Sequence, residues 1–387
     1  MGMGRSNRRT SNVAIPICAL GALSESLFYT ALAPLLTQLD DALGFGHEQA
    51  GLLVAGYAIG YWLGTYPASW LSAHLGPRTT GVLGVSCVAL ATLGFALGDS
   101  FKTLLGARLL VGVGSVIAYT GLLAMAAALA DASEQGLAIG TVYSGSAAGS
   151  AVGPLVGSLA VTLGRGPVFC ALAAAQAIVA ALCWQLPRVP NTKHLSMGEM
   201  GRYFRSARVR TALWITSVPG YALGVLTLSG TYRLDEIGAS ATAIAIAFSG
   251  IAVINVVLAP RIGQASDRIG RRRPLMLALS VSAIAILLML GATLKIPTVV
   301  LIAIAGAFML AVAGPGLALV GDGVRELRGD PAHATVLMNL CWGPAAALGA
   351  ITAGMVHGAR GAGLSLLLLA FVAAVSLIPV HRLEEQP

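Results

Sequence analysis

The chain has 387 residues, of which 56% are hydrophobic and only 10% are charged. A soluble domain carries about 25% charged residues, so this composition excludes an ordinary soluble enzyme and indicates an integral membrane protein. The formal net charge of +8 would otherwise suggest a nucleic-acid partner, but loops that face anionic lipid head groups account for it, and we expect none.

Apolar stretches long enough to cross a bilayer as helices recur along the whole chain. They are rich in Gly, Ala and Leu without a period of two, which favours helices over barrel strands. We predict an all-α polytopic membrane protein with twelve transmembrane helices, at 13–38, 48–71, 79–98, 103–130, 137–162, 167–187, 211–232, 240–262, 274–294, 296–320, 333–357 and 362–380.

The distribution of Lys and Arg predicts the orientation. With the N-terminus in the cytoplasm, 18 of the 24 Lys and Arg residues fall in cytoplasmic segments and five in outer segments, while Arg108 lies within the fourth span. Positive charge favours the cytoplasmic side, so we expect both termini inside an inner or plasma membrane. The stretch from Arg188 to Arg210 is basic and amphipathic, and we expect it to lie on the membrane surface as a linker.

In the first span, Glu25 lies about 18 Å from residue 13, near the middle of the bilayer. A carboxylate at this depth is costly, and its protonation can be coupled to ligand binding, so a functional role is the default reading. The structural alternative is a glutamate satisfied by a neighbouring hydroxyl or arginine. Tyr29 follows four residues later on the same helix face.

In the fourth span, Arg108 cannot lose its proton, so it can stabilise a carboxylate or a bound anion but cannot carry the proton. Its structural alternative is snorkelling to the outer interface. Other amphipathic residues are deep enough to line a cavity, although each could instead belong to an interfacial belt or bridge two helices. They are Tyr57, Tyr61, Tyr119, Trp214, Tyr221, Asn255, Asn339 and Trp342.

In the fifth span, Gly140, Gly149, Gly153, Pro154 and Gly157 form the pattern G-x8-G-x3-G-P-x2-G. Glycines four residues apart share one helix face and let a neighbouring helix approach closely, and proline removes a backbone hydrogen bond. Ordinary small-residue packing is the alternative. In the tenth span, Gly314-Pro315-Gly316 is expected to break the helix by the same backbone argument.

A loop between two spans, Gly263-Gln-Ala-Ser-Asp267-Arg268-Ile-Gly270-Arg271-Arg272, is rich in glycine and charge. A weaker copy, Ser69–Arg78, lies 194 residues earlier when Gly76 is aligned with Gly270, and it has Ala73 and His74 where the later loop has Asp267 and Arg268.

The repeat predicts two related membrane halves, an arrangement typical of transporters with the binding site between them. We expect an N-terminal six-helix bundle at 1–187, the linker at 188–210 and a C-terminal six-helix bundle at 211–387.

The chain resembles the major facilitator superfamily. The loop from Gly263 to Arg272 matches the G-x-x-x-D-R-x-G-R-R motif of that family at every defined position. The fifth-span pattern is similar to the antiporter motif of drug:proton exchangers. Glu25 resembles the acidic first-helix position of vesicular amine transporters, which carry Asp there.

The resemblance implies two pseudo-symmetric bundles that work by alternating access around a cavity lined by spans 1, 2, 4 and 5 and spans 7, 8, 10 and 11. It also implies that the loop from Gly263 to Arg272 is a cytoplasmic gate, with Asp267 near a helix N-terminus and paired with an arginine. The antiporter motif is associated with export more than import.

We therefore expect a secondary active transporter, a monomer, that exports a small hydrophobic or cationic compound in exchange for protons through Glu25. The alternative is a facilitator or proton symporter that imports a small metabolite, in which Arg108 would bind an anionic substrate and Glu25 the coupling proton. A receptor or assembly factor without transport is a further alternative. No enzyme activity, cofactor or metal is expected, since no metal cluster or Ser/His pair has usable spacing inside the spans.

Overall fold

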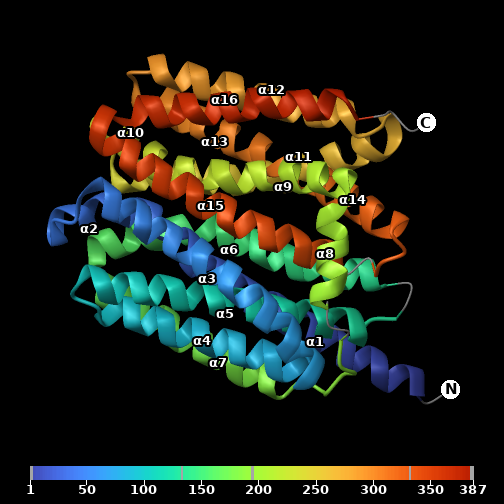
Figure 1. Cartoon of the computed structure of the whole chain (residues 1–387). Helices are drawn as coiled ribbons and strands as arrows, with labels where there is room; N and C mark the ends of the chain where they lie inside the picture. The colour runs from blue at the N-terminus through green and yellow to red at the C-terminus, as the bar shows by residue number, and fades with distance from the viewer. Residues whose placement is uncertain (1–2, 132–133, 193–195, 331–332, 384–387) are drawn as a thin grey trace. The chain divides into compact units, whose positions relative to one another are not determined.

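The computed structural model of the chain describes residues 3–131, 134–192, 196–330 and 333–383. Throughout these residues the regular elements are helices (Figure 1), which confirms the all-α prediction. The chain divides into two compact units, Met1–Ala31 with Ile59–His194 and Leu32–Ala58 with Leu195–Pro387.

In the first unit, α1 packs along α6, and α4 packs against both α5 and α7 (Figure 1). α5 begins at a capping box in which the Ser100 and Thr103 side chains each accept from the other residue's backbone N–H, as unpaired amides at a helix start require. The helices of this unit are α1 (Met3–Thr30), the second part of α3 (Gly46–His74), α4 (Pro77–Leu97), α5 (Phe101–Leu129), α6 (Gln135–Leu163) and α7 (Arg165–Trp184).

The second unit repeats this pattern, since α9 packs along α15 and α12 packs against α13 and α16. Its helices beyond the first part of α3 are η1 (Ala33–Leu35), α2 (Leu36–Leu43), α8 (Met197–Arg205), α9 (Ala207–Val225), η2 (Leu226–Gly230), α10 (Thr231–Glu236), α11 (Ala241–Ile269), α12 (Arg272–Gly291), α13 (Lys295–Ala311), α14 (Ala313–Glu326), α15 (His333–Arg360) and α16 (Ala362–His381).

Glycines with positive φ occur at equivalent corners of the two repeats. Gly76 and Gly270, the aligned residues of the two loop copies, have φ of 83° and 82°. Gly44 and Gly238 are also 194 residues apart and have φ of 62° and 71°. Side chains with a β-carbon rarely adopt these angles, so the repeat inferred from sequence extends to backbone conformation.

Eleven of the predicted spans coincide with helices that are long and apolar enough to cross a membrane, counted over the described residues. The remaining span, 48–71, lies within α3, which has 29 residues but does not meet the same hydropathy requirement. Tyr57, Tyr61 and Trp62 lower its mean hydropathy, since aromatic residues with polar groups are less apolar than Leu or Val.

Two of the spans are interrupted where a proline makes a regular helix unfavourable. Pro34 lies in the short 3₁₀ turn η1 between α1 and α2. α13 ends at Ala311 and α14 begins at Ala313, just before Pro315, which confirms the predicted break in the tenth span. Proline lacks the N–H that an α-helix requires and clashes with the preceding turn.

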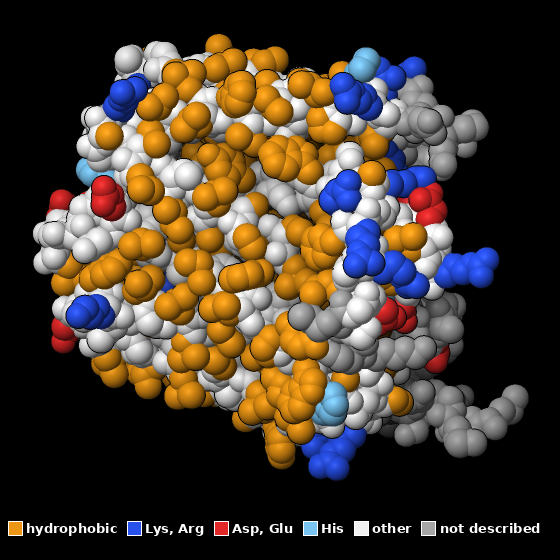
Figure 2. Space-filling model, viewed as in Figure 1, with side chains coloured by type: hydrophobic (Ala, Val, Ile, Leu, Met, Phe, Trp, Pro, Cys, Tyr) orange, Lys and Arg blue, Asp and Glu red, His pale blue; other side chains and the backbone are white. Residues whose placement is uncertain are grey.

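The linker helix α8 docks on protein as well as carrying basic residues. Hydrophobic side chains cover the flanks of α12 and α16 in Figure 2, while Lys and Arg gather near α8. Tyr203 of α8 is fully buried, and its hydroxyl is 2.9 Å from Nδ1 of His333. The prediction of a helix that simply lies on the membrane surface is therefore incomplete, because an aromatic side chain gains more by burial against the α14–α15 connection.

Candidate functional site

A glycine seam joins α6 to α1 in the first unit. Four glycines of α6, four residues apart, each face the carbonyl of one residue of α1 or, in the last case, of the turn that follows α1. The pairs are Gly145 with Ala19, Gly149 with Leu23, Gly153 with Leu27 and Gly157 with Ala31. A β-carbon at any of these glycines would come closer than 3.0 Å to that carbonyl oxygen, which real β-carbons essentially never do. The seam therefore requires glycine for steric reasons.

The seam differs from the predicted motif at one end. Gly140 has no atom within 4 Å of an added β-carbon and lies outside the seam, because nine residues do not bring it onto the face of Gly149. Gly145 was missed, although continuing the four-residue interval upstream from Gly149 would have identified it. Pro154 is buried within α6.

Glu25 lies on α1 beside this seam and is 4% exposed. The Ser26 hydroxyl donates to Glu25 Oε1 at 2.8 Å. The same hydroxyl lies 2.7 Å from the Ser146 hydroxyl of α6. The backbone contact at Gly149 brings the two helices close enough for this pair of serines to meet. A hydrogen bond to a carboxylate favours its ionised form, which offsets part of the cost of burial.

Three tyrosines lie within electrostatic range of the carboxylate. The charge of Glu25 acts on Tyr29, Tyr61 and Tyr119, which lie on α1, α3 and α5. The ring centroid of Tyr119 lies 5.7 Å from that of Tyr143. Three of the predicted cavity residues thus lie within electrostatic range of Glu25 in the first unit, while Tyr57 is buried in the second unit.

Arg108 is buried, with 2% exposure, rather than extended to the outer interface. Its guanidinium donates to the Tyr29 carbonyl at 3.3 Å and lies 5.7 Å from the ring centroid of Phe28. Phe28 packs edge-on against Phe95 and Phe169, with centroids 5.2 and 5.5 Å away. A guanidinium is the cation that best tolerates such apolar, aromatic surroundings, because it is weakly hydrated and stacks on rings.

The candidates of the second unit fall into two groups. The first lies along the α9–α15 contact: Trp342 packs against Gly220, and the Tyr221 hydroxyl lies 3.4 Å from the Thr352 hydroxyl. Asn339 is half-buried on α15.

The second group connects helices. Asn255 of α11 donates to the Ala307 carbonyl of α13 at 3.0 Å. Trp214 of α9 is 49% exposed and donates to the Ser376 hydroxyl of α16 at 3.2 Å. Both make bonds that a purely structural residue would make.

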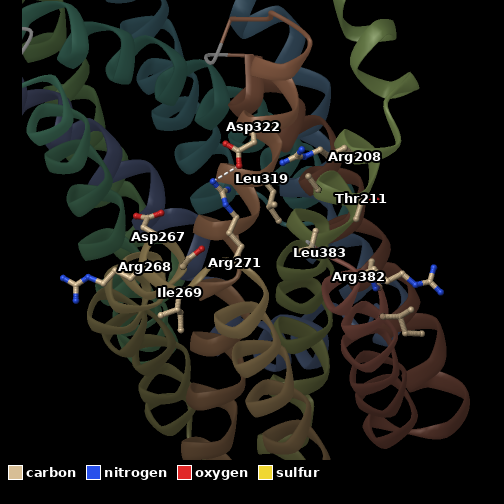
Figure 3. A pocket seen from close by; sticks show the side chains of 15 residues that line it. Arg208, Thr211, Asp267, Arg268, Ile269, Arg271, Leu319, Asp322, Arg382 and Leu383 are labelled. Atoms are coloured by element: carbon tan, nitrogen blue, oxygen red, sulfur yellow. Dashed lines mark ion pairs between the residues drawn. The ribbon is translucent and has the colours of Figure 1, made fainter. Parts of the chain in front are cut away.

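The loop motif of the second unit lines a cavity of about 850 Å³. Its central feature is an ion pair between Arg271 Nη2 and Asp322 Oδ2 of α14, at 2.7 Å (Figure 3). Arg325 also pairs with Asp322. Arg268 points away from this pair in Figure 3.

The predicted pairing of Asp267 is not observed among the described residues. Asp267 lies in the last turn of α11, at a C-terminal helix end, and is exposed. No ion pair of Asp267 occurs in the described part of the chain. A carboxylate gains nothing from the negative end of a helix dipole, and it is Asp322 that accepts the arginine.

The weaker loop copy is held differently. Arg78 lies 4.8 Å over the Trp184 ring of α7. The Asn191 side chain, at the start of the linker, donates to the Ala73 carbonyl at 2.8 Å. Amide and cation–π contacts thus hold this loop, whereas an Arg271–Asp322 ion pair holds the later one. In the residues that the structure describes, no group of three or more His, Cys, Asp or Glu side chains is arranged to hold a metal ion.

A repeated all-helical membrane fold, with a buried carboxylate in one repeat and a charged loop in the other, defines a membrane transporter rather than an enzyme. The model of the Major Facilitator Superfamily matches residues 18–234 and 220–387. The chain belongs to this superfamily, so it is a multi-pass membrane protein that acts on a small-molecule substrate within a lipid bilayer.

Two crystal structures have the same fold. Both are of a bacterial homologue of the human lysosomal transporter Spinster in an inward-facing conformation. The unoccupied form has 13% sequence identity and a TM-score of 0.76, covering 96% of this chain and 97% of that chain. The occupied form has 16% identity and a TM-score of 0.77, covering 96% of each chain. Likeness at this identity concerns the fold alone. A search of curated proteins found no match.

Proposed function

We propose that the protein is a proton-coupled antiporter that exports a small hydrophobic or cationic compound by alternating access. The single observation that carries this proposal is the burial of Glu25, 4% exposed, among tyrosines beside the glycine seam. In this scheme the bundles at 1–187 and 211–387 rock about the site. The protein is a monomer in the inner or plasma membrane, and both termini lie in the cytoplasm.

Burial makes the protonation of Glu25 sensitive to what occupies the site. An isolated ionised carboxylate is costly in a low-dielectric interior, so it is stabilised either by a proton or by a cation nearby. A proton and a cationic substrate would therefore compete for Glu25. Competition of this kind is sufficient for exchange: protonation from outside releases the substrate, and deprotonation toward the cytoplasm favours the next substrate.

The tyrosines suit such a substrate. Rings of Tyr29, Tyr61 and Tyr119 provide apolar surface and negative π-faces, which attract organic cations. Arg108 stays charged, and its bond to the Tyr29 carbonyl links it to the Glu25 helix. Its positive charge would favour the ionised carboxylate and so ease proton release.

The cytoplasmic ion pair suits a gate. The side chains of Arg271 and Asp322 are each 24% exposed. Solvent can therefore hydrate both charges when the pair breaks, so that the free-energy cost of breaking it is modest. We propose that this pair, with Gly263, Asp267, Arg268, Gly270 and Arg272 of the same loop, stabilises the cytoplasmic end of the second repeat during the cycle.

The second candidate is import of a small anionic metabolite by facilitated diffusion or proton symport. The observation that favours it is Arg108, whose buried guanidinium could bind a carboxylate or phosphate. By symport an anionic substrate would enter together with protons, and by facilitated diffusion it would only equilibrate, whereas under the antiport proposal the substrate leaves as protons enter.

The test uses purified protein in proteoliposomes with an imposed pH gradient and a panel of lipophilic cations. We expect cation addition to release protons in the wild type and not in Glu25→Gln. Glu48→Gln is the matched control, since it makes the same change at an exposed carboxylate. If Glu25→Gln releases protons as the wild type does, Glu25 does not carry the proton. If no cation moves protons while a radiolabelled anion is taken up, the import alternative replaces the proposal.

A further inference from the structure

An apolar groove adjoins the arginine-lined cavity of the second unit. The groove has a volume of about 380 Å³ and is lined by residues of α9 and α16. Its exposed side chains include Trp214, at 49%, and Ile378, at 54%. Thr211, Ile378 and Pro379 line both the groove and the cavity of about 850 Å³, so the two spaces meet between α9 and α16.

The cavity carries an excess of positive charge. Its lining has four arginines and two aspartates. Arg208 pairs with Glu326, and Asp322 pairs with Arg325, the two partners lying outside the lining. Five arginines and three carboxylates therefore leave a net charge of +2. No salt bridge of Arg382 occurs within the part of the chain that the structure describes.

The charged and apolar parts follow each other along the same two helices. Trp214 lies about 9 Å along α9 from Arg208, and Val375 lies about 10 Å along α16 from Arg382. The head-group region of a bilayer is about 5–8 Å thick on each side of the hydrocarbon core. Because both helices belong to candidate spans, the arginines lie at head-group depth and the groove at the depth of the acyl chains. Figure 2 shows hydrophobic side chains along α16 and basic side chains at its end.

We propose that an anionic phospholipid binds across these two spaces. Its phosphate lies in the cavity near Arg208 and Arg382, and an acyl chain lies in the groove against Trp214 and Ile378. Guanidinium groups bind phosphate through paired N–H donors, and basic pockets between transmembrane helices suit acidic head groups. A soluble anion would occupy the cavity alone and leave the exposed apolar groove uncovered, so the groove favours a lipid.

Arg208 and Arg382 are the lining arginines closest to the groove along their helices. Arg208 is one helical turn from Thr211 on α9, and Arg382 is one turn from Ile378 and Pro379 on α16. The backbone N–H of Arg382 donates to the Ile378 carbonyl, which places Arg382 in the last turn. Each arginine therefore lies next to a residue that the cavity and the groove share.

The lipid leaves the ion pair of the proposed gate in place. In Figure 3, Arg208 and Arg382 lie on one side of the bond between Arg271 and Asp322. The inference goes beyond the proposed function and requires neither Glu25 nor proton exchange. Each proposal can therefore fail while the other stands.

The experiment measures the quenching of Trp214 fluorescence by brominated acyl chains, which quench tryptophan on contact. The protein is reconstituted in phosphatidylcholine vesicles that contain either brominated phosphatidylglycerol or brominated phosphatidylcholine at the same mole fraction. Subtracting the signal of Trp214→Phe removes the contribution of the remaining tryptophans. We expect phosphatidylglycerol to quench Trp214 with an apparent affinity about fivefold or more above that of phosphatidylcholine, the effect of a basic side chain near an anionic head group.

The double variant Arg208→Gln/Arg382→Gln is expected to lose this preference. Arg188→Gln/Arg360→Gln is the matched control and should keep it, since it removes two exposed arginines that line neither space. Arg382→Gln alone should lower the preference and leaves the pair of Arg208 with Glu326 intact. This single variant serves as the test if the double variant does not fold.

Equal quenching by the two lipids in the wild type would overturn the inference. A preference that the Arg208→Gln/Arg382→Gln variant retains would do so as well, because the attraction would then come from the net charge of the whole chain. The third contrary outcome is loss of the preference when millimolar inorganic phosphate is added at constant ionic strength, which would assign the cavity to a soluble anion. All of these measurements leave proton release by Glu25→Gln untouched, so they distinguish the lipid site from the proposed function.

Discussion

The glycine seam can be tested by adding one carbon atom at Gly157. A β-carbon there would lie 2.9 Å from the Ala31 carbonyl carbon and 3.2 Å from its Cα, and closer still to the oxygen, whereas ordinary contact begins at 3.4 Å. These are backbone atoms, so no rotamer change can relieve the clash, and α1 must move away from α6. Gly140→Ala is the matched control, since an added β-carbon there meets nothing within 4 Å.

Both substitutions gain the same helix propensity, about 1 kcal/mol, so this term cancels in the comparison. Overpacking costs about 1–3 kcal/mol, and Gly157→Ala should be less stable than Gly140→Ala by that amount. Unfolding in mixed detergent micelles, followed by circular dichroism, gives the two free energies of unfolding. Equal stabilities would refute the argument, because they would mean that α1 and α6 are not held in contact at this position.

Three further predictions concern the second unit and the linker. Arg271→Gln and Asp322→Asn should show a coupling of about 0.5–1 kcal/mol in a double-mutant cycle of stability, small because the pair is partly exposed; no coupling would mean that the pair does not form. Tyr232→Phe removes the 2.7 Å hydrogen bond to Asp40 and should cost about 1–3 kcal/mol in the free energy of unfolding; an unchanged value would contradict that bond. Hydrogen bonds from Ser196 at the α8 cap lower the pKa of Glu199. Its ionised form therefore stabilises α8 above the ordinary carboxyl pKa, and this stabilisation disappears as the pH falls through the lowered value. Amide protection factors in α8 should fall with acid in wild type but not in Glu199→Gln, and the same fall in both would show that the Glu199 carboxylate does not cause it.

The spans and the break in the tenth span could be predicted from sequence because their causes are local. A run of apolar residues determines where the chain can cross a bilayer, and Gly314-Pro315-Gly316 marks the break. The interruption at Pro34 was not predicted, because proline alone does not decide the matter: Pro154 lies inside the continuous helix α6. The π-helical segment Leu226–Gly230 has no comparable signal. It contains no proline, and its wider turn depends on neighbouring helices.

The site could be predicted only in part, because its geometry joins distant segments. Glu25 was identified by depth alone, since a buried carboxylate is conspicuous in an apolar span. Ser26 is adjacent in sequence, but Ser146 is ordinary in a helix rich in small residues, and only the α1–α6 contact brings the two together. Asp322 was missed for the same reason: nothing in the tenth span points to Arg271.

The backbone-to-backbone seam has a consequence for how the substrate range of this transporter can change. A side chain that touches a neighbour can be exchanged for another of similar size, but a carbonyl facing a glycine leaves no side chain to vary. In a library of random substitutions selected for altered transport, we therefore expect few surviving variants at Gly149, Gly153 and Gly157 and more at Tyr61 and Tyr119. Close backbone packing thus constrains the helices that carry Glu25, and under the proposed function a change of substrate would have to come from side chains such as Tyr61 and Tyr119.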